Sequence, residues 1–210
     1  MNDVLARIHG IDWKACGLET FGKPGNYYTR QVGRWGKQWE LSKQAEIPEM
    51  DRVIEWLNAH IPAEDETTLV HGDYRLGNMM FHRTKPEVVA VFDWELSTLG
   101  HPLGDLAYNL LPYYNEPHEF NGVKGLDFNT LGIPHLPEYV DEYCQRTGRS
   151  EFDLTFYMVF SLFRSAAIAE GIAARAASGI ASSENADEVG VMTRSYAEKA
   201  WRLVESEGLN

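Results

Sequence analysis

Three short runs of β-branched, aromatic and other apolar residues stand inside a chain whose remaining patterns are helical. The runs are Thr68–His71, Met79–His82 and Val88–Phe92, and turn residues separate each from the next. Runs this short and this few cannot build a doubly wound parallel sheet. We therefore expect an α+β, mostly α fold in which a small β insertion in the first half holds a site.

Helical periodicity predicts the elements on both sides of this insertion. Pro48–Ile61 is the clearest helix, because Pro48 occupies a favourable first position and one apolar stripe runs along the segment. Leu154–Ile168 is apolar on nearly all sides, which predicts a central buried helix. The remaining predicted elements are an opening helix that ends near Gly10, a turn-rich stretch over 21–30, and helices over Val32–Ala45, 102–111, 136–147, 153–178 and 184–206.

Composition and charge argue against several classes of function. The formal net charge of −12 disfavours a nucleic-acid surface, which needs clustered Lys and Arg. It is compatible with a nucleotide, because a divalent metal can bring a polyphosphate into an acidic cleft. The polar start of the chain is unlike a secretion signal, and no apolar run is expected to span a membrane. Cys16 and Cys144 form no metal-binding or disulfide pattern, so we expect a cytoplasmic protein with no nucleic-acid or membrane partner.

Polar side chains follow the predicted strands at positions where burial would disfavour them. Asp73 comes just after the first run, Asn78 lies five residues later, and Asp93 follows the third run. A carboxylate at the end of a buried strand is costly to desolvate, and a bound cation would relieve that cost. Oxygen ligands without cysteine or a close histidine pair suit Mg²⁺ or Mn²⁺ rather than Zn²⁺. The order matches kinase-type phosphoryl transfer, in which one Asp takes the hydroxyl proton while an Asn and a second Asp hold metal.

Three segments resemble the aminoglycoside phosphotransferase and choline kinase family, which has a protein-kinase-like fold. His71–Asn78 reads HGDYRLGN and is similar to the catalytic loop of that family, and Asp93–Glu95 is similar to its metal-binding Asp-Trp element. Leu99–Tyr108 resembles the start of a helix that follows in the family. The similarity to the subgroup associated with acyl-CoA dehydrogenases extends over Leu69–Tyr108, and more loosely over Asn2–Leu203.

The resemblance implies a role for each matching residue. Asp73 would be the catalytic base, while Asn78 and Asp93 would bind the metal and, through it, ATP. His71 would orient the catalytic loop by hydrogen bonding, and Asp105 would tie a helix start to that loop. The implied cofactors are Mg²⁺ (or Mn²⁺) and ATP as co-substrate.

Some assignments stay open between a functional and a structural role. Arg75 could contact phosphate or substrate, or form a surface ion pair. Glu95 could assist the metal or substrate, or cap a turn. His101 stands where the family more often has an acidic residue, and this departure puts only the local turn in doubt.

The segment before Asp73 lacks the elements that grip ATP in kinases of this kind. These are a glycine-rich loop between two strands, a strand lysine and a helix glutamate that holds the lysine. We therefore interpret residues 1–210 as one kinase-like C-terminal lobe without its N-terminal lobe. The isolated chain is expected to fold but to transfer no phosphoryl group, and a dimer or a separate N-lobe partner stays open.

The predicted function is transfer of the γ-phosphoryl group of ATP to a hydroxyl of a small molecule. The resemblance implies aminoglycoside-like, choline-like or hydroxyacyl-CoA-like acceptors, with specificity in the loop Pro112–His135 and the helices after it. One alternative is a truncated, non-catalytic kinase-like fragment. A remote one is a metallophosphoesterase, which needs an Asp-x-His and a Gly-Asn-His, whereas Asn78 is followed here by Met79.

Overall fold

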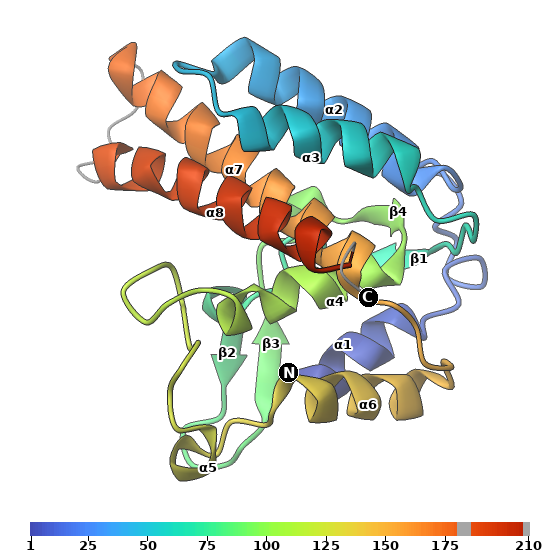
Figure 1. The fold of residues 1–210 in the computed structure, drawn as a ribbon. Helices are drawn as coiled ribbons and strands as arrows, with labels where there is room; N and C mark the ends of the chain where they lie inside the picture. The colour runs from blue at the N-terminus through green and yellow to red at the C-terminus, as the bar shows by residue number, and fades with distance from the viewer. Residues whose placement is uncertain (180–185, 208–210) are drawn as a thin grey trace. The chain divides into compact units, whose positions relative to one another are not determined.

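A computed structural model of the chain describes residues 1–179 and 186–207 (Figure 1). The chain divides into two compact units. The first unit consists of Met1–Gly25 and Glu64–Asp153, and the second of Asn26–Ala63 and Leu154–Asn210. The expected site residues all belong to the first unit.

The second unit is helical, and it has the most apolar helix of the chain at its centre. Helix α7 (Thr155–Ala177) packs against α8 (Ala186–Glu207), α2 (Tyr27–Ser42) and α3 (Pro48–Ala59). These neighbours explain why α7 is apolar on several sides, as the sequence predicts. The fully buried side chains of this core include Trp39, Met50, Leu57, Phe160 and Phe163.

A buried carboxylate closes the turn between α2 and α3. Glu170 of α7 is 6% exposed, and its Oε1 accepts a hydrogen bond of 2.8 Å from the backbone N–H of Gln44. The bond compensates part of the cost of removing this carboxylate from water. It also fixes the chain where it leaves α2.

Of the described residues, α7 has the length and composition of a membrane-spanning helix, with a mean hydropathy of 1.3 in its most apolar stretch. The sequence patterns did not predict such a helix. However, 83% of that stretch is buried, and core helices of globular proteins share its length and composition. The helix is therefore weak support for a membrane span.

The strands of the first unit form two separate antiparallel pairs. Strand β1 (Thr68–Val70) pairs antiparallel with β4 (Thr98–Gly100), and β2 (Met79–Phe81) pairs antiparallel with β3 (Val88–Val91). The sequence predicts three strands in this β insertion, and the structure adds a fourth, β4, as the partner of β1. The missed strand β4 has only three residues and is followed by His101 and Pro102, so it carries no alternating pattern.

The helices of the first unit surround these strands. Helix α1 (Asn2–His9) contacts α6 (Leu136–Thr147) and β1, and α4 (Pro102–Leu110) also contacts β1. The predicted long loop contains a 3₁₀ turn at its start, Leu111–Tyr113, and a short helix α5 (Phe128–Leu131). The loop is therefore more structured than its Gly, Asn and Pro content indicates.

Most predicted helix boundaries lie within a few residues of the observed ones. The exception is α2, which begins at Tyr27 inside the stretch expected to be irregular. Its first turn is helical because Tyr27, Tyr28 and Val32 place their side chains on one buried face. The predicted last helix began at 184, and residues 184–185 lie outside the described part of the chain.

Candidate active site

The catalytic-loop segment leaves β1 through a glycine that no other residue can replace without strain. Gly72 has φ of +85°, a backbone conformation that side chains with a Cβ rarely adopt. A Cβ at this position would also overlap the backbone carbonyl of Leu96. Leu96 ends the 3₁₀ turn Trp94–Leu96, so Gly72 lets the loop pass against the segment that follows Asp93.

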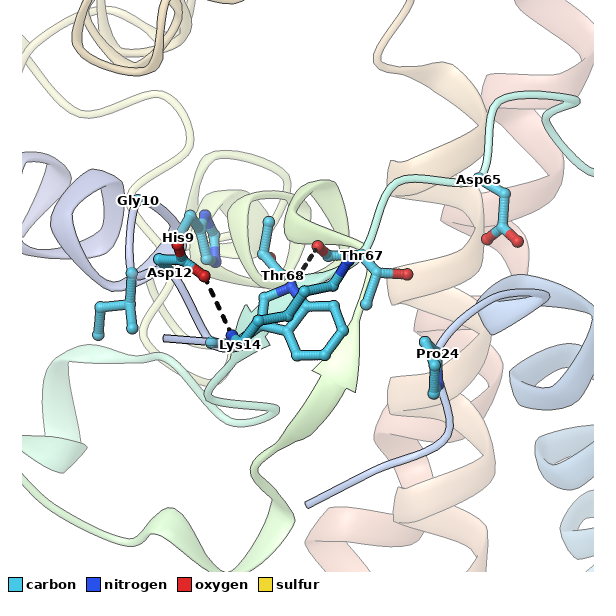
Figure 2. A pocket seen from close by; sticks show the side chains of 10 residues that line it. His9, Gly10, Asp12, Lys14, Pro24, Asp65, Thr67 and Thr68 are labelled. Carbon is cyan, nitrogen blue, oxygen red and sulfur yellow. Dashed lines mark hydrogen bonds between the residues drawn. The ribbon is translucent and has the colours of Figure 1, made fainter. Parts of the chain in front are cut away.

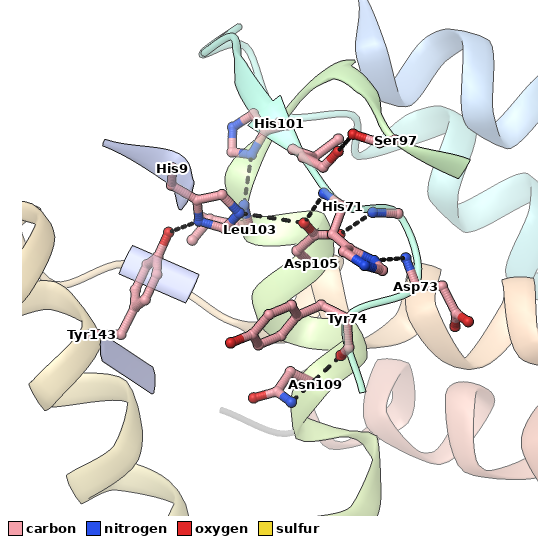
Figure 3. Close-up of polar contacts among 12 residues, drawn as sticks. His9, His71, Asp73, Tyr74, Ser97, His101, Leu103, Asp105, Asn109 and Tyr143 are labelled. Atoms are coloured by element: carbon pink, nitrogen blue, oxygen red, sulfur yellow. Dashed lines mark hydrogen bonds and ion pairs between the residues drawn. The ribbon is translucent and has the colours of Figure 1, made fainter. Parts of the chain in front are cut away.

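Asp105 of α4 holds the backbone of this loop (Figure 3). Its side chain is 3% exposed, its Oδ2 accepts the N–H of His71 at 2.6 Å, and its Oδ1 accepts the N–H of Gly72 at 2.8 Å. Burial raises the pKa of Asp105, but hydrogen bonds from His9 and from the two backbone amides outweigh it and hold the pKa below its ordinary value. Asp105 is thus an ionised anchor, placed where it ties a helix start to the loop.

His71 connects the two strand ends of the site. Its Nδ1 accepts the backbone N–H of Asp73 at 3.2 Å, so the proton resides on Nε2, which donates to the carbonyl oxygen of Phe92 at 2.8 Å. The ring is fully buried and lies 4.7 Å from the ring of Trp94. His71 therefore braces the loop that carries Asp73 against the residue that precedes Asp93.

Asp73 and Asn78 contact each other directly. The Asn78 amide nitrogen donates to Asp73 Oδ2 at 2.7 Å and to the Asp73 backbone oxygen at 2.9 Å. Both amide protons of Asn78 are used in this way, which leaves its Oδ1 as the atom that can bind a cation. The Asp73 side chain keeps 17% of its surface exposed, so its carboxylate can be reached from solvent.

Asp93 lies beside Asn78 at the open end of the β2–β3 pair. The N–H of Phe92 donates to the Asn78 carbonyl oxygen at 2.8 Å, which continues the pairing of Met79 with Val91. Asp93 is exposed, has left-handed backbone angles (φ 64°, ψ 56°) and makes no side-chain cap bond to the turn that follows. A non-glycine residue in this conformation is uncommon and often marks a functional site.

The donor atoms fit a hard divalent cation. Asn78 Oδ1 and the Asp93 carboxylate are oxygen ligands, and Mg²⁺ typically binds one or two carboxylates together with water and substrate phosphates. Within residues 1–179 and 186–207, no group of three or more His, Cys, Asp or Glu side chains could hold a metal. The described part of the chain thus offers a partial ligand set of this phosphate-sharing kind and no all-protein cage.

Arg75 forms a partly buried ion pair with Asp73. Its Nε lies 3.1 Å from Asp73 Oδ2, and its guanidinium carbon lies 5.8 Å from the ring centre of Phe120. Phe120 belongs to the loop between α4 and α6, so that loop reaches the neighbourhood of Asp73. Glu95 is exposed in the turn after Asp93, so both of its roles stay open.

His101 takes the structural place of the acidic residue that the resemblance led us to expect. It is the N-cap of α4, and its Nδ1 accepts the backbone N–H of Leu103 at 3.3 Å. Burial lowers the pKa of His101 to about 4, which keeps the ring neutral and able to accept this bond. The departure therefore preserves the helix start.

Sequence reasoning missed two residues of the anchor, His9 and Tyr143. His9 Nε2 lies 3.4 Å from Asp105 Oδ2, and His9 Nδ1 lies 2.7 Å from the Tyr143 hydroxyl oxygen. His9 follows Leu5 and Ile8 on the buried face of α1, which marks it as a core position but does not reveal its partners. They lie 96 and 134 residues away in the chain.

His9 also borders an open depression of about 820 Å³ at the end of α1 (Figure 2). Trp13, Lys14, Asp65 and Thr68 are among the other residues that line it. None of its lining residues is Asp73, Asn78 or Asp93, so this hollow is separate from the proposed site.

Comparison with known proteins decides the family. The model of the phosphotransferase enzyme family matches residues 1–157. This chain belongs to that family. Phosphotransferases of this family use ATP as phosphoryl donor.

Two longer proteins share high similarity with the chain. The chain is 48% identical over 212 residues to acyl-CoA dehydrogenase family member 10 of Mus musculus, and covers 99% of itself and 20% of that protein. It is 38% identical over 208 residues to acyl-CoA dehydrogenase family member 11 of Gallus gallus, and covers 27% of that protein. The chain thus spans about a quarter or less of these relatives.

Solved structures of phosphotransferases share the fold. A proposed aminoglycoside phosphotransferase from Ralstonia eutropha JMP134 is 49% identical, with a TM-score of 0.94, and the match covers 98% of this chain and 63% of that one. A type I macrolide 2′-phosphotransferase is 15% identical with a TM-score of 0.60, over 92% of this chain and 56% of that one. The predicted fold class, a mostly helical portion of the protein-kinase-like fold with a small β insertion, is confirmed.

Proposed function

We propose that this phosphotransferase chain is the catalytic lobe of a small-molecule kinase that transfers the γ-phosphoryl group of ATP to a hydroxyl. The observation that carries the proposal is the direct contact of Asn78 with Asp73 at the point where the β2–β3 pair returns Asp93. A base and two oxygen ligands at one edge are the parts that kinase-type transfer requires on this lobe.

Asp73 is held in an orientation suited to a general base. In the described part of the chain, Asn78 Nδ2 and Arg75 Nε both reach Oδ2, which leaves Oδ1 to accept the hydrogen of an acceptor hydroxyl. Fixing the carboxylate in this way reduces the reorganisation needed when the alcohol arrives.

Asn78 and Asp93 would hold Mg²⁺ or Mn²⁺, which would neutralise the phosphate oxygens of ATP and stabilise the leaving group. His71 keeps the two sides of this arrangement together, because it bonds to the backbone of both Asp73 and Phe92. The alignment of alcohol and phosphate therefore depends on His71 although it does not need to touch either.

The acceptor is proposed to bind between the base and the loop that follows α4. Phe120 of this loop is 50% exposed and lies over Arg75, and the loop is held by an ion pair of 2.8 Å between Lys124 and Glu116. An exposed aromatic ring beside the base suits the flat or apolar part of an organic acceptor. Aminoglycoside-like, choline-like and hydroxyacyl-CoA-like alcohols are the classes to compare.

Metal binding can be tested on the 210-residue chain without an acceptor. Titration with Mn²⁺ should broaden the NMR signals of Asn78 and Asp93 first, because paramagnetic relaxation falls steeply with distance from the metal. Asp93→Asn should weaken the effect, and Glu87→Gln, an exposed carboxylate at the other end of the β2–β3 pair, is the matched control. Equal broadening in the unsubstituted chain and in Asp93→Asn would contradict the assigned metal site.

Phosphoryl transfer is best measured in a two-lobe version, in which the ATP-binding lobe of a family member is fused ahead of Met1. We expect a phosphorylated alcohol with one of the three acceptor classes in the presence of ATP. We expect no phosphate release from simple phosphate esters in the absence of ATP. Phosphate release from esters alone would support a metallophosphoesterase instead. A two-lobe protein that binds Mg-ATP but phosphorylates no alcohol would support the non-catalytic alternative.

A further inference from the structure

The anchor of the catalytic loop continues beyond Asp105 into a buried chain of polar side chains (Figure 3). The imidazole of His9 lies between Tyr143 and Asp105, with contacts of 2.7 Å from Nδ1 to the Tyr143 oxygen and 3.4 Å from Nε2 to Asp105 Oδ2. The side chain of His9 is 2% exposed, and Tyr143 is fully buried. Helices α1, α6 and α4 thus each contribute one group.

The chemistry of Asp105 fixes the direction of its bond to His9. An ionised Asp105 can only accept, so His9 Nε2 carries a proton and donates it. Burial raises the pKa of Tyr143, so its hydroxyl keeps its proton and can form the 2.7 Å hydrogen bond with His9 Nδ1 as either donor or acceptor. Both ring nitrogens of His9, the hydroxyl of Tyr143 and both carboxylate oxygens of Asp105 thus have hydrogen-bond partners, as buried polar groups require.

We propose that His9 is a positioning residue for the proposed phosphotransferase reaction, acting through Asp105 on the catalytic loop. Asp105 accepts the amides of His71 and Gly72, and Asp73 is the next residue. His9 supplies the third donor to that carboxylate and so restricts its rotation. The inference rests on the proposed role of Asp73, because positioning matters for the reaction only if Asp73 is the base.

Packing alone is the competing explanation for a buried histidine. The rings of His9 and Tyr143 also make an edge contact, with centroids 5.8 Å apart and planes at 84°. Substitution can separate the two explanations. His9→Phe keeps a ring and removes the donor, whereas His9→Gln loses the ring and keeps an N–H that can reach Asp105.

Amide hydrogen exchange of His71 and Gly72, measured by NMR on the 210-residue chain, tests the proposal. We expect His9→Phe to accelerate exchange of these two amides by about tenfold or more relative to the amides of α7, because a hydrogen bond to a charged group is lost. Tyr143→Phe should give a smaller change in the same direction. His9→Gln should restore slow exchange.

Ile8→Val is the matched control, since it shortens a buried side chain of α1 next to His9 without touching Asp105. Equal exchange at His71 and Gly72 in His9→Phe and Ile8→Val would overturn the proposal, as would acceleration in His9→Gln equal to that in His9→Phe. If His9→Phe does not fold, an unchanged exchange rate in Tyr143→Phe would overturn it. No nucleotide is present in the measurement, so its outcome is separate from whether the chain transfers phosphate.

Discussion

The anchor around Asp105 and the open edge around Asp73 and Asp93 use the same residue type for opposite purposes. Asp105 is 3% exposed, and both of its oxygens accept hydrogen bonds from within the chain. Asp93 is exposed and makes no cap bond, and Asp73 is held through one oxygen in the described structure. A carboxylate whose bonding capacity is filled holds the fold, and one with free capacity can bind or react.

Substitution of the base should give the largest difference between the two regions. In a two-lobe version, Asp73→Ala should lower the turnover number by about 10²–10⁴-fold, the usual loss when a general base is removed. Its free energy of unfolding should fall by about 1 kcal/mol, because Asn78 and Arg75 lose a hydrogen-bond acceptor. Steady-state kinetics and urea unfolding measure the two effects. Unchanged turnover with the true acceptor would show that Asp73 is not the base.

Replacement of aspartate by alanine at the anchor should mainly lower the stability of the fold. Asp105→Ala leaves the amides of His71 and Gly72 buried without an acceptor, so we expect a loss of about 3 kcal/mol in the free energy of unfolding. Asp93→Ala is the matched control in the 210-residue chain and should cost about 0.5 kcal/mol or less. Equal losses in urea unfolding would remove the distinction between the two regions.

Gly72 belongs to the anchor because its backbone N–H donates to Asp105. An added methyl group at Gly72 tests how much stability depends on the close approach of the loop to Leu96. Gly72→Ala meets the carbonyl of Leu96 and keeps a strained positive φ, so we expect a loss of about 2 kcal/mol. Gly125→Ala is a useful control, because Gly125 has φ of +78° but no atom near its added Cβ. Gly125→Ala therefore measures the cost of the strained φ alone, without steric overlap. Chemical denaturation of both variants should show a larger loss in the free energy of unfolding for Gly72→Ala.

Per unit of pH, the smallest effect should come from the titration of His101. The pKa of His101 is lowered from 6.5 to about 4 by folding, so between these pH values the unfolded chain protonates this ring more readily than the folded one. The stabilising contribution of the neutral ring is therefore fully present above pH 6.5 and is lost as the pH falls towards 4. The slope attributable to His101 should be about 1 kcal/mol per pH unit. His101→Asn retains a capping acceptor without a titrating group. An identical pH dependence of unfolding in the variant would contradict this account.

Local patterns allowed most of the helices and the residues of the open edge to be predicted. The Pro48 start and the apolar periodicity of α3 are properties of adjacent residues, and so is the spacing of Asp73 and Asn78. The hairpin between β2 and β3 is also local, which is why Asp93 could be expected near Asn78.

The anchor could be predicted only in part, because its contacts join distant segments. The resemblance implied a structural Asp105, but nothing near His9 in the sequence indicates Tyr143 or Asp105 as its partner. Strand β4 was missed for the same reason, since three residues become a strand only when β1 lies beside them. Helix α2 was predicted too short because burial of Tyr27 and Tyr28 overrides the turn residues before them.

The two donors that share Oδ2 of Asp73 have a stereochemical consequence. With Asn78 and Arg75 on one oxygen, an alcohol meets the carboxylate through Oδ1, from a single side. In the proposed reaction, the direction from which the hydroxyl approaches the base would therefore follow from two hydrogen bonds that never touch the acceptor.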